Sequence, residues 1–285
     1  MKQRYRLLTA IAFCGILGST TKAQNLADFA NEGDKNLAAK NYEGAIKNYL
    51  AALELDSTNT DFTTAFNLGL AYEGLNDYQQ SITAFKQSIL KGNSEGLLFK
   101  KIKENAELAK CDDCMEKIFI DIRENREDLS PLMNEKLFYI FASKQENRKA
   151  IDCAQAVLEN NPNHFPLLKN VGLIYNNANK SDSALIYLER AHELKNEDET
   201  VNKVIGLIYF NICESKMAAE VSNYEKLSNK THSAHNTMMY NRQNYVRQYY
   251  DKSVKHLESA NNKLNDPELS KLITRMRQSL DAYKK

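Results

Sequence analysis

The sequence predicts an all-α fold, an α-solenoid of stacked antiparallel helix pairs closed by a C-terminal capping helix. A glycine-centred motif recurs after 34 residues, at Val171–Tyr175 (VGLIY) and again at Ile205–Tyr209 (IGLIY). Only ten Gly and four Pro occur in 285 residues, which leaves little material for β turns. No run of alternating apolar and polar residues indicates a strand. The three observations together favour paired helices over a sheet.

The repeated glycine has a physical reason. Gly in a helix interior costs about 1 kcal/mol relative to Ala, so Gly172 and Gly206 are expected where two helices approach closely. Ala184 and Ala191 supply small residues from the second helix of the pair. A 34-residue period with these positions resembles the tetratricopeptide repeat. The resemblance implies a helical scaffold that binds other proteins or peptides.

Residues 1–23 have the order of a secretory signal peptide. Three basic residues among the first six precede an apolar stretch at Leu7–Leu17, and the segment ends on Ala23. We expect cleavage before Gln24 and a periplasmic or secreted protein. Lipidation at Cys14 is the alternative, and only then is membrane association expected. Phe13 is too bulky for the usual lipidation motif.

Six repeats are expected in the mature chain, at residues 26–59, 62–95, 96–129, 131–164, 165–198 and 199–265, with a capping helix at 267–284. The third repeat is degenerate. Lys103 occupies its glycine position and Met115 its first alanine position, while Phe119 and Ile122 keep the apolar spacing of its second helix.

The sixth repeat carries an insertion at about residues 211–247. Gly206 and Ser253 are 47 residues apart, where Gly172 and Ala184 are 12 apart. No Gly or Pro interrupts residues 207–266. The segment is therefore predicted as a helical hairpin that turns near residues 228–235 and projects roughly 25 Å beyond the stack. An unrecognised seventh repeat is the alternative.

The resemblance also implies a binding groove lined by the first helix of each repeat. The groove positions in this sequence are Phe66, Leu70, Glu73, Tyr139, Lys169, Asn170, Leu173, Asn176, Lys203 and Leu207. Some members of the family hold a peptide's terminal carboxylate with Lys and Asn side chains. Lys169, Asn170 and Lys203 match that clamp in part, but Leu173 stands where it has Asn.

Candidate chemical sites are few. Cys111 and Cys114 form one CxxC motif, with no second motif and no nearby His to complete a zinc site. A local disulfide or two unpaired thiols are therefore favoured over redox catalysis. His232 and His235 lack an acidic partner at ligand spacing. No catalytic triad order, carboxylate pair or phosphate-binding loop occurs. We expect no enzyme, no cofactor, no metal and no small-molecule substrate.

Tyrosines gather on the returning arm of the insertion, at Tyr240, Tyr245, Tyr249 and Tyr250. This spacing suits both packing between two long helices and an exposed partner surface. Without residues 1–23 the chain has 34 Lys and Arg against 37 Asp and Glu, so no nucleic-acid surface is expected. The sequence predicts an exported scaffold for protein or peptide partners. The alternative is an assembly component of an envelope complex that acts through residues 207–266.

Overall fold

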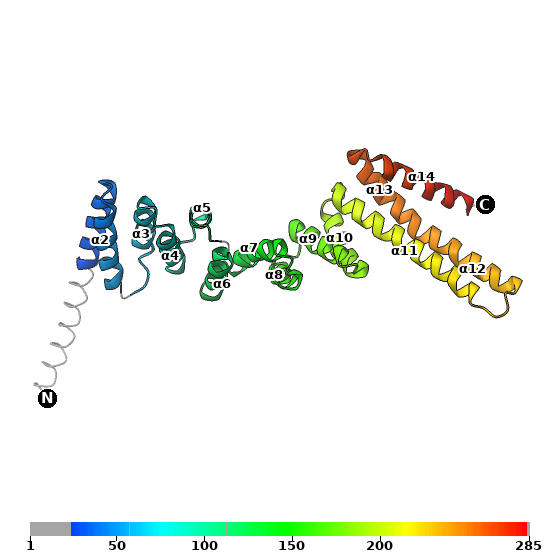
Figure 1. Cartoon of the computed structure of the whole chain (residues 1–285), viewed down its shortest axis with the longest axis horizontal. Helices are drawn as coiled ribbons and strands as arrows, with labels where there is room; N and C mark the ends of the chain where they lie inside the picture. The colour runs from blue at the N-terminus through cyan, green and yellow to red at the C-terminus, as the bar shows by residue number, and fades with distance from the viewer. Residues whose placement is uncertain (1–23, 57, 112, 284–285) are drawn as a thin grey trace, which may run out of the picture. The chain divides into compact units, whose positions relative to one another are not determined.

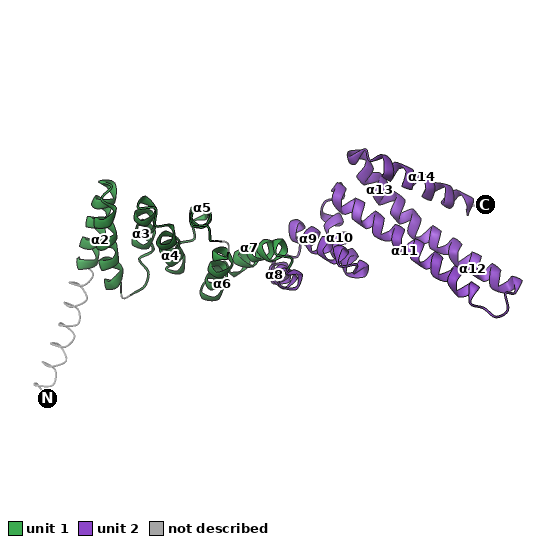
Figure 2. Cartoon of the chain, in the orientation of Figure 1, with its two compact units in different colours: residues 1–145 green, residues 146–285 purple. Residues whose placement is uncertain are grey.

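The structure, a computed structural model, describes residues 24–56, 58–111 and 113–283. The predicted signal peptide therefore lies outside the described residues. The chain divides into two compact units, Met1–Gln145 and Glu146–Lys285 (Figure 2). The division falls within residues 131–164, so the two helices predicted to form the fourth repeat belong to different units. The described residues are helices and connecting turns without a strand, and the predicted all-α fold of antiparallel helix pairs is confirmed.

The first unit begins with helical residues 24–38. The elements that follow are α2 (Tyr42–Leu55), α3 (Phe62–Gly74), α4 (Tyr78–Leu90), α5 (Gly96–Leu108), α6 (Cys114–Asn125), the 3-10 turn η1 (Glu127–Leu129) and α7 (Ser130–Ser143) (Figure 1). The second unit contains α8 (Asn147–Asn160), α9 (Phe165–Asn177), α10 (Ser181–Leu194), α11 (Glu199–Glu225), α12 (His232–Tyr245), the π-helical turn η2 (Val246–Tyr250), α13 (Asp251–Leu264) and α14 (Pro267–Ala282).

Short polar turns separate the two helices of a pair, and α3–α4 shows how the sequence builds one. Asn76 takes a left-handed backbone conformation with φ of 60°, which Asn tolerates better than most residues. Asp77 follows and accepts a hydrogen bond from the backbone nitrogen of Gln80 at 3.2 Å, which caps α4. Two adjacent residues thus end one helix and start the next.

Four pairs are packed through a glycine of the first helix. A β-carbon added to that glycine would lie 2.5 or 2.6 Å from a large side chain on the second helix. These contacts join Gly33 to Tyr49, Gly69 to Phe85, Gly172 to Leu188 and Gly206 to Leu257. The large side chain comes 16 residues after the glycine in the first three pairs. The glycine is required because no larger residue leaves room for that contact.

The segment after Gly206 is a helical hairpin in the structure. The 27-residue helix α11 runs out, and the chain returns through α12, η2 and α13 (Figure 1). Ser253 donates a hydrogen bond to the Gly206 carbonyl at 2.7 Å, as Ser81 does to the Gly69 carbonyl at 2.9 Å. The additional residues therefore lengthen both helices and leave the contact at the base of the pair unchanged.

The hairpin does not project alone. Helix α14 packs beside α13 and η2, and Gln243 and Arg247 donate hydrogen bonds to the Tyr283 carbonyl at 3.0 and 2.5 Å. A buried apolar cluster joins α11, η2, α13 and α14. Its members are Cys213, Val246, Tyr250, Val254, Leu257, Leu269, Ile273 and Met276. The C-terminal helix thus supports the returning arm at α13 and η2.

Candidate peptide-binding surfaces

The groove positions predicted in the first unit differ in how much of each side chain is available. Phe66 is half-buried, with its ring 5.6 Å from that of Phe85, and Leu70 is half-buried as well. Both carboxylate oxygens of Glu73 accept hydrogen bonds from Lys101, at 2.8 and 3.0 Å. Tyr139 is the exposed member, with 44% of its surface accessible. It is the best candidate in this group for contact with a partner.

The lysines of the partial clamp in the second unit already have carboxylate partners. The ammonium of Lys169 lies 3.0 and 2.9 Å from the two oxygens of Asp198, and Lys203 lies 3.3 Å from Asp266. Asp198 also caps α11 by accepting from the backbone nitrogen of Val201 at 2.9 Å. Neither lysine is therefore free to neutralise a peptide carboxylate without giving up an ion pair.

The remaining predicted positions of the second unit are partly covered. Asn170, Leu173 and Asn176 are half-buried on α9, and Leu207 packs against the cluster that joins the hairpin to α14. They present polar amides and parts of apolar side chains, with no free charge.

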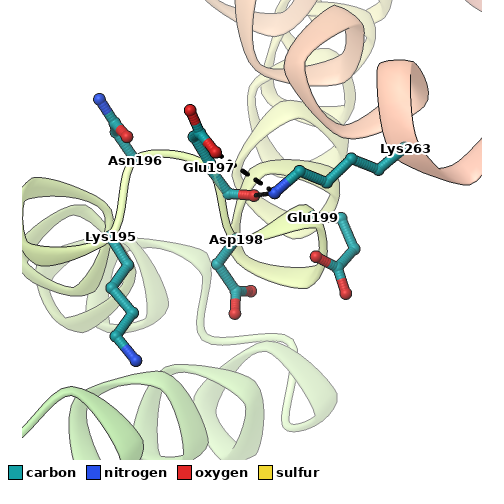
Figure 3. A pocket seen from close by; sticks show the side chains of 6 residues that line it. All are labelled: Lys195, Asn196, Glu197, Asp198, Glu199 and Lys263. Atoms are coloured by element: carbon teal, nitrogen blue, oxygen red, sulfur yellow. Dashed lines mark hydrogen bonds and ion pairs between the residues drawn. The ribbon is translucent and has the colours of Figure 1, made fainter.

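A hollow in the second unit lies between the α10–α11 turn and the end of α13 (Figure 3). Lys263 reaches across it, 2.7 Å from the carbonyl of Glu197 and 3.6 Å from its carboxylate. The ammonium of Lys195 lies 4.4 Å from the centre of the Phe165 ring, and Asp198 is held by Lys169. These contacts involve four of the five charged residues that line the hollow, and Glu199 is the fifth.

The first unit holds a more apolar pocket of about 360 Å³. Its lining comes from three helices: Phe99 and Lys103 on α5, Met115 and Phe119 on α6, and Lys136, Tyr139 and Ile140 on α7. Among the predicted groove positions only Tyr139 belongs to it. The sequence did carry a signal for the other residues that line this pocket, because Lys103 and Met115 replace the small residues of a regular pair.

The four cysteines of the described residues fall into two groups. Cys111 and Cys114 form a disulfide across the turn before α6, with 5.5 Å between their α-carbons. Cys153 and Cys213 are buried, and burial raises the pKa of the Cys213 thiol to about 12. No group of three or more metal-binding side chains occurs within the described residues.

A half-buried histidine, His256, lies at the base of the hairpin. Nδ1 of His256 is 2.8 Å from Oδ1 of Asn202, and its ring stands edge-on to that of His192 at 4.7 Å. Burial, followed by the charge of His192, lowers the pKa of His256 to about 4, although Glu189 acts in the opposite direction. His256 is therefore neutral at pH 7 and serves the packing of α13.

The tyrosines of the returning arm mostly pack within the hairpin. Tyr250 is buried and donates to Glu214, and the Tyr245 hydroxyl donates to Glu220 at 3.1 Å. Tyr240 is 63% exposed near the tip. Within the described part of the chain, no helix has the length and apolar character needed to cross a bilayer.

Comparison with known proteins agrees with the helix-pair geometry. Residues 63–90 match the family model of the tetratricopeptide repeat. This range covers most of α3 and α4 and includes the Gly69–Phe85 contact. No curated protein matches the chain by sequence.

Several solved structures are similar to the chain at low identity. A protein from Bacteroides ovatus ATCC 8483 is 15% identical, with a TM-score of 0.49 over 78% of this chain and 99% of that one. A TPR repeats protein from Bacteroides fragilis NCTC 9343 is 17% identical, with a TM-score of 0.35 over 91% and 97%. YrrB, a TPR protein with an unusual peptide-binding site, is 21% identical, with a TM-score of 0.37 over 61% and 87%.

Proteins built from this repeat are generally scaffolds and not catalysts. Residues 63–90 thus form a tetratricopeptide repeat, and the same glycine contact recurs in three other helix pairs.

Proposed function

We propose that this chain is an exported scaffold that binds protein or peptide partners in a cell envelope. The observation that carries the binding role is the pocket between α5, α6 and α7, which presents apolar side chains beside the exposed Tyr139. Concave apolar sites with a few polar groups are where proteins usually take ligands. Aromatic side chains such as Tyr139 are also frequent contributors to binding energy at interfaces.

Export is supported by residues 1–23, in which basic, apolar and small residues follow the order of a signal peptide. The test is N-terminal sequencing of the protein from a bacterium that expresses the full chain. The mature form should begin at or near Gln24 and appear in the periplasmic or secreted fraction. A chain that keeps Met1, or one that carries a lipid on Cys14, would contradict cleavage and release.

Binding is tested with a displayed library of short peptides and the purified chain as bait. A scaffold of this kind should enrich a shared sequence pattern, and a synthetic peptide with that pattern should bind reversibly. A protein partner should be captured from an envelope fraction by crosslinking and retained after repurification. If neither experiment yields a saturable partner, the proposed binding role fails.

The second candidate is an assembly component that acts through the hairpin, and the hairpin tip is the observation that favours it. Tyr240, Leu227 and Val221 are exposed there, at 63%, 45% and 37%. The segment to replace with a Gly/Ser turn is residues 221–240, because Gln243 and Val246 contact α14 or the buried cluster. Loss of partner capture in this variant, with capture unaffected by changes in the pocket, would favour the assembly role.

A further inference from the structure

The α5–α6 pair lacks the glycine contact that closes four of the other pairs. In α3–α4 the glycine is Gly69, Ser81 follows after 12 residues and Phe85 after 16. The same spacing in α5–α6 gives Lys103, Met115 and Phe119. The lysine and methionine therefore stand at the two positions where the neighbouring pair has small residues.

Large residues at these two positions leave no room for the close helix contact of a regular pair. At Gly69 even a single added β-carbon would lie 2.5 Å from the ring of Phe85, so a lysine at that position cannot fit against a large side chain. Helices α5 and α6 contact each other far less than α3 and α4 do. Lys103 turns outward, with 70% of its side chain exposed. The space that remains is the 360 Å³ pocket.

Aromatic rings and an ammonium group define the chemistry of this pocket. The rings of Phe99 and Phe119 are 6.4 Å apart and tilted by 59°. The ammonium of Lys136 lies 5.4 Å from the centre of the first ring and 5.9 Å from the second. A cation over two rings beside an apolar space suits a ligand that brings both an apolar group and a negative charge.

Lys136 differs from the other half-buried lysines of the first unit. Lys86 pairs with Asp121 at 2.5 Å, and Lys101 pairs with Glu73 at 2.8 Å. In the part of the chain that the structure describes, Lys136 has no carboxylate at ion-pair distance. A half-buried ammonium without a counter-ion is a favourable position for a carboxylate of a partner.

Two acidic groups, Glu107 and Glu135, lie near the pocket. Lys103 lies 3.9 Å from Glu107, and both side chains are largely exposed, so this ion pair is weak. An acidic group, Glu135, is close enough to Tyr139 to raise the pKa of its hydroxyl, after the larger effect of burial. Two lysines thus line the pocket and two carboxylates lie near it, so the charges are balanced in number. The preference for an acidic ligand therefore rests on Lys136, whose ammonium lies over the two rings.

We infer that this pocket receives a large apolar side chain, Phe or Leu, from an acidic peptide segment whose neighbouring carboxylate pairs with Lys136. The inference rests on the proposed peptide-binding function and specifies its ligand class and its site. The rings of Phe99 and Phe119 would contact the apolar side chain of the peptide. The Lys136 ammonium would favour a carboxylate on a neighbouring peptide residue.

The test uses the purified chain and three fluorescein-labelled peptides. The first has one Phe flanked on both sides by Asp and Glu, the second has Ala in place of Phe, and the third has Lys in place of the acidic residues. Fluorescence anisotropy gives the dissociation constants. The acidic Phe peptide should bind at least about tenfold more tightly than either of the others, and added salt should weaken its binding.

Two variants and a matched control assign the site. Lys136→Met keeps an apolar stem and removes the charge, and it should weaken binding of the acidic Phe peptide about tenfold. Lys103→Gly with Met115→Ala restores the small residues of a regular pair and should close the pocket. Lys100→Met changes an exposed lysine of α5 outside the pocket and should leave affinity within about twofold. Circular dichroism checks that each variant folds.

Several results would overturn the inference. The acidic and basic peptides could bind equally, or Lys136→Met could bind like the wild type. Peptides enriched from the library that bind all variants equally would leave the scaffold function standing and place its site elsewhere. A dimer seen by sedimentation that dissociates in the Lys103→Gly/Met115→Ala variant would show that the pocket is filled by a second copy of the chain.

Discussion

Replacing Gly172 with alanine has two opposite effects on stability. Helix propensity favours alanine, whereas packing against the neighbouring helix favours glycine, and the structure indicates that the packing effect is larger. Alanine is favoured over glycine in a helix by about 1 kcal/mol. At Gly172 the new β-carbon would lie 2.5 and 2.7 Å from Cγ and Cδ2 of Leu188 and 3.3 Å from its backbone nitrogen. Leu188 is fully buried, so its side chain cannot move into solvent.

Overpacking of a close contact typically costs about 1–3 kcal/mol. Here the clash involves the branch point of a leucine and the backbone, so the helices must separate. We expect Gly172→Ala to lower the free energy of unfolding by about 1 kcal/mol after the propensity gain. Gly172→Leu, which adds a whole side chain, should cost about 3 kcal/mol or more.

Urea denaturation followed by circular dichroism measures these differences, and the chain provides its own control. A β-carbon at Gly96, at the start of α5, would meet nothing within 4 Å, so Gly96→Ala should be neutral or slightly stabilising. In a Leu188→Ala background the clash is removed, and Gly172→Ala should no longer destabilise. Two results would refute the close-contact explanation. The Gly172→Ala variant could be as stable as the wild type, or the substitution could lower the free energy of unfolding equally in the wild-type and Leu188→Ala backgrounds.

Three further predictions concern buried charges and the disulfide. Asp56 and Lys91 form an ion pair of 2.7 Å, and their side chains are 3% and 2% exposed. Burial alone would raise the pKa of Asp56. Hydrogen bonds to its carboxylate, of which that from Lys91 is the strongest, hold this pKa well below its ordinary value. Asp56→Asn should therefore destabilise by about 3–5 kcal/mol, measured by thermal and urea unfolding. The variant leaves the buried Lys91 charge without a counter-ion, with the Asn59 amide oxygen at 2.8 Å as a neutral acceptor. The pKa of His256 is about 4 in the folded chain, against 6.5 for an ordinary histidine. The unfolded chain therefore binds more protons between these two values, and the free energy of unfolding should fall by up to about 3 kcal/mol as the pH drops from 6.5 to 4. His256→Gln should flatten that dependence in unfolding curves taken across this pH range. Reduction of Cys111–Cys114, which closes a very short loop, should cost no more than about 2 kcal/mol, and loss of all folded structure by circular dichroism after reduction would contradict this.

The sequence by itself determined the helical class and the close contacts within several pairs. Gly69, Gly172 and Gly206 stand out because glycine is unfavourable in a helix interior, and each indeed meets a large side chain of the second helix. The period also exposed the α5–α6 pair as irregular, through Lys103 and Met115. These close contacts can be predicted from local sequence, because the size of the residue at the contact position limits how closely the adjacent helix can pack.

The tertiary structure alone decided which charged and aromatic groups are available to a partner. The sequence predicts Lys169 and Lys203 as cations available to a partner. In the structure they pair with Asp198 and Asp266, which are 29 and 63 residues away along the chain. Lys136 had no distinguishing sequence feature, and it lies unpaired over two rings only because α5, α6 and α7 meet there. The position of α14 against the hairpin was likewise undetermined, because an amphipathic helix specifies that it must bury one face but not against which neighbour. Periodicity thus fixes the burial of a residue, whereas its partners depend on distances between elements that no local pattern encodes.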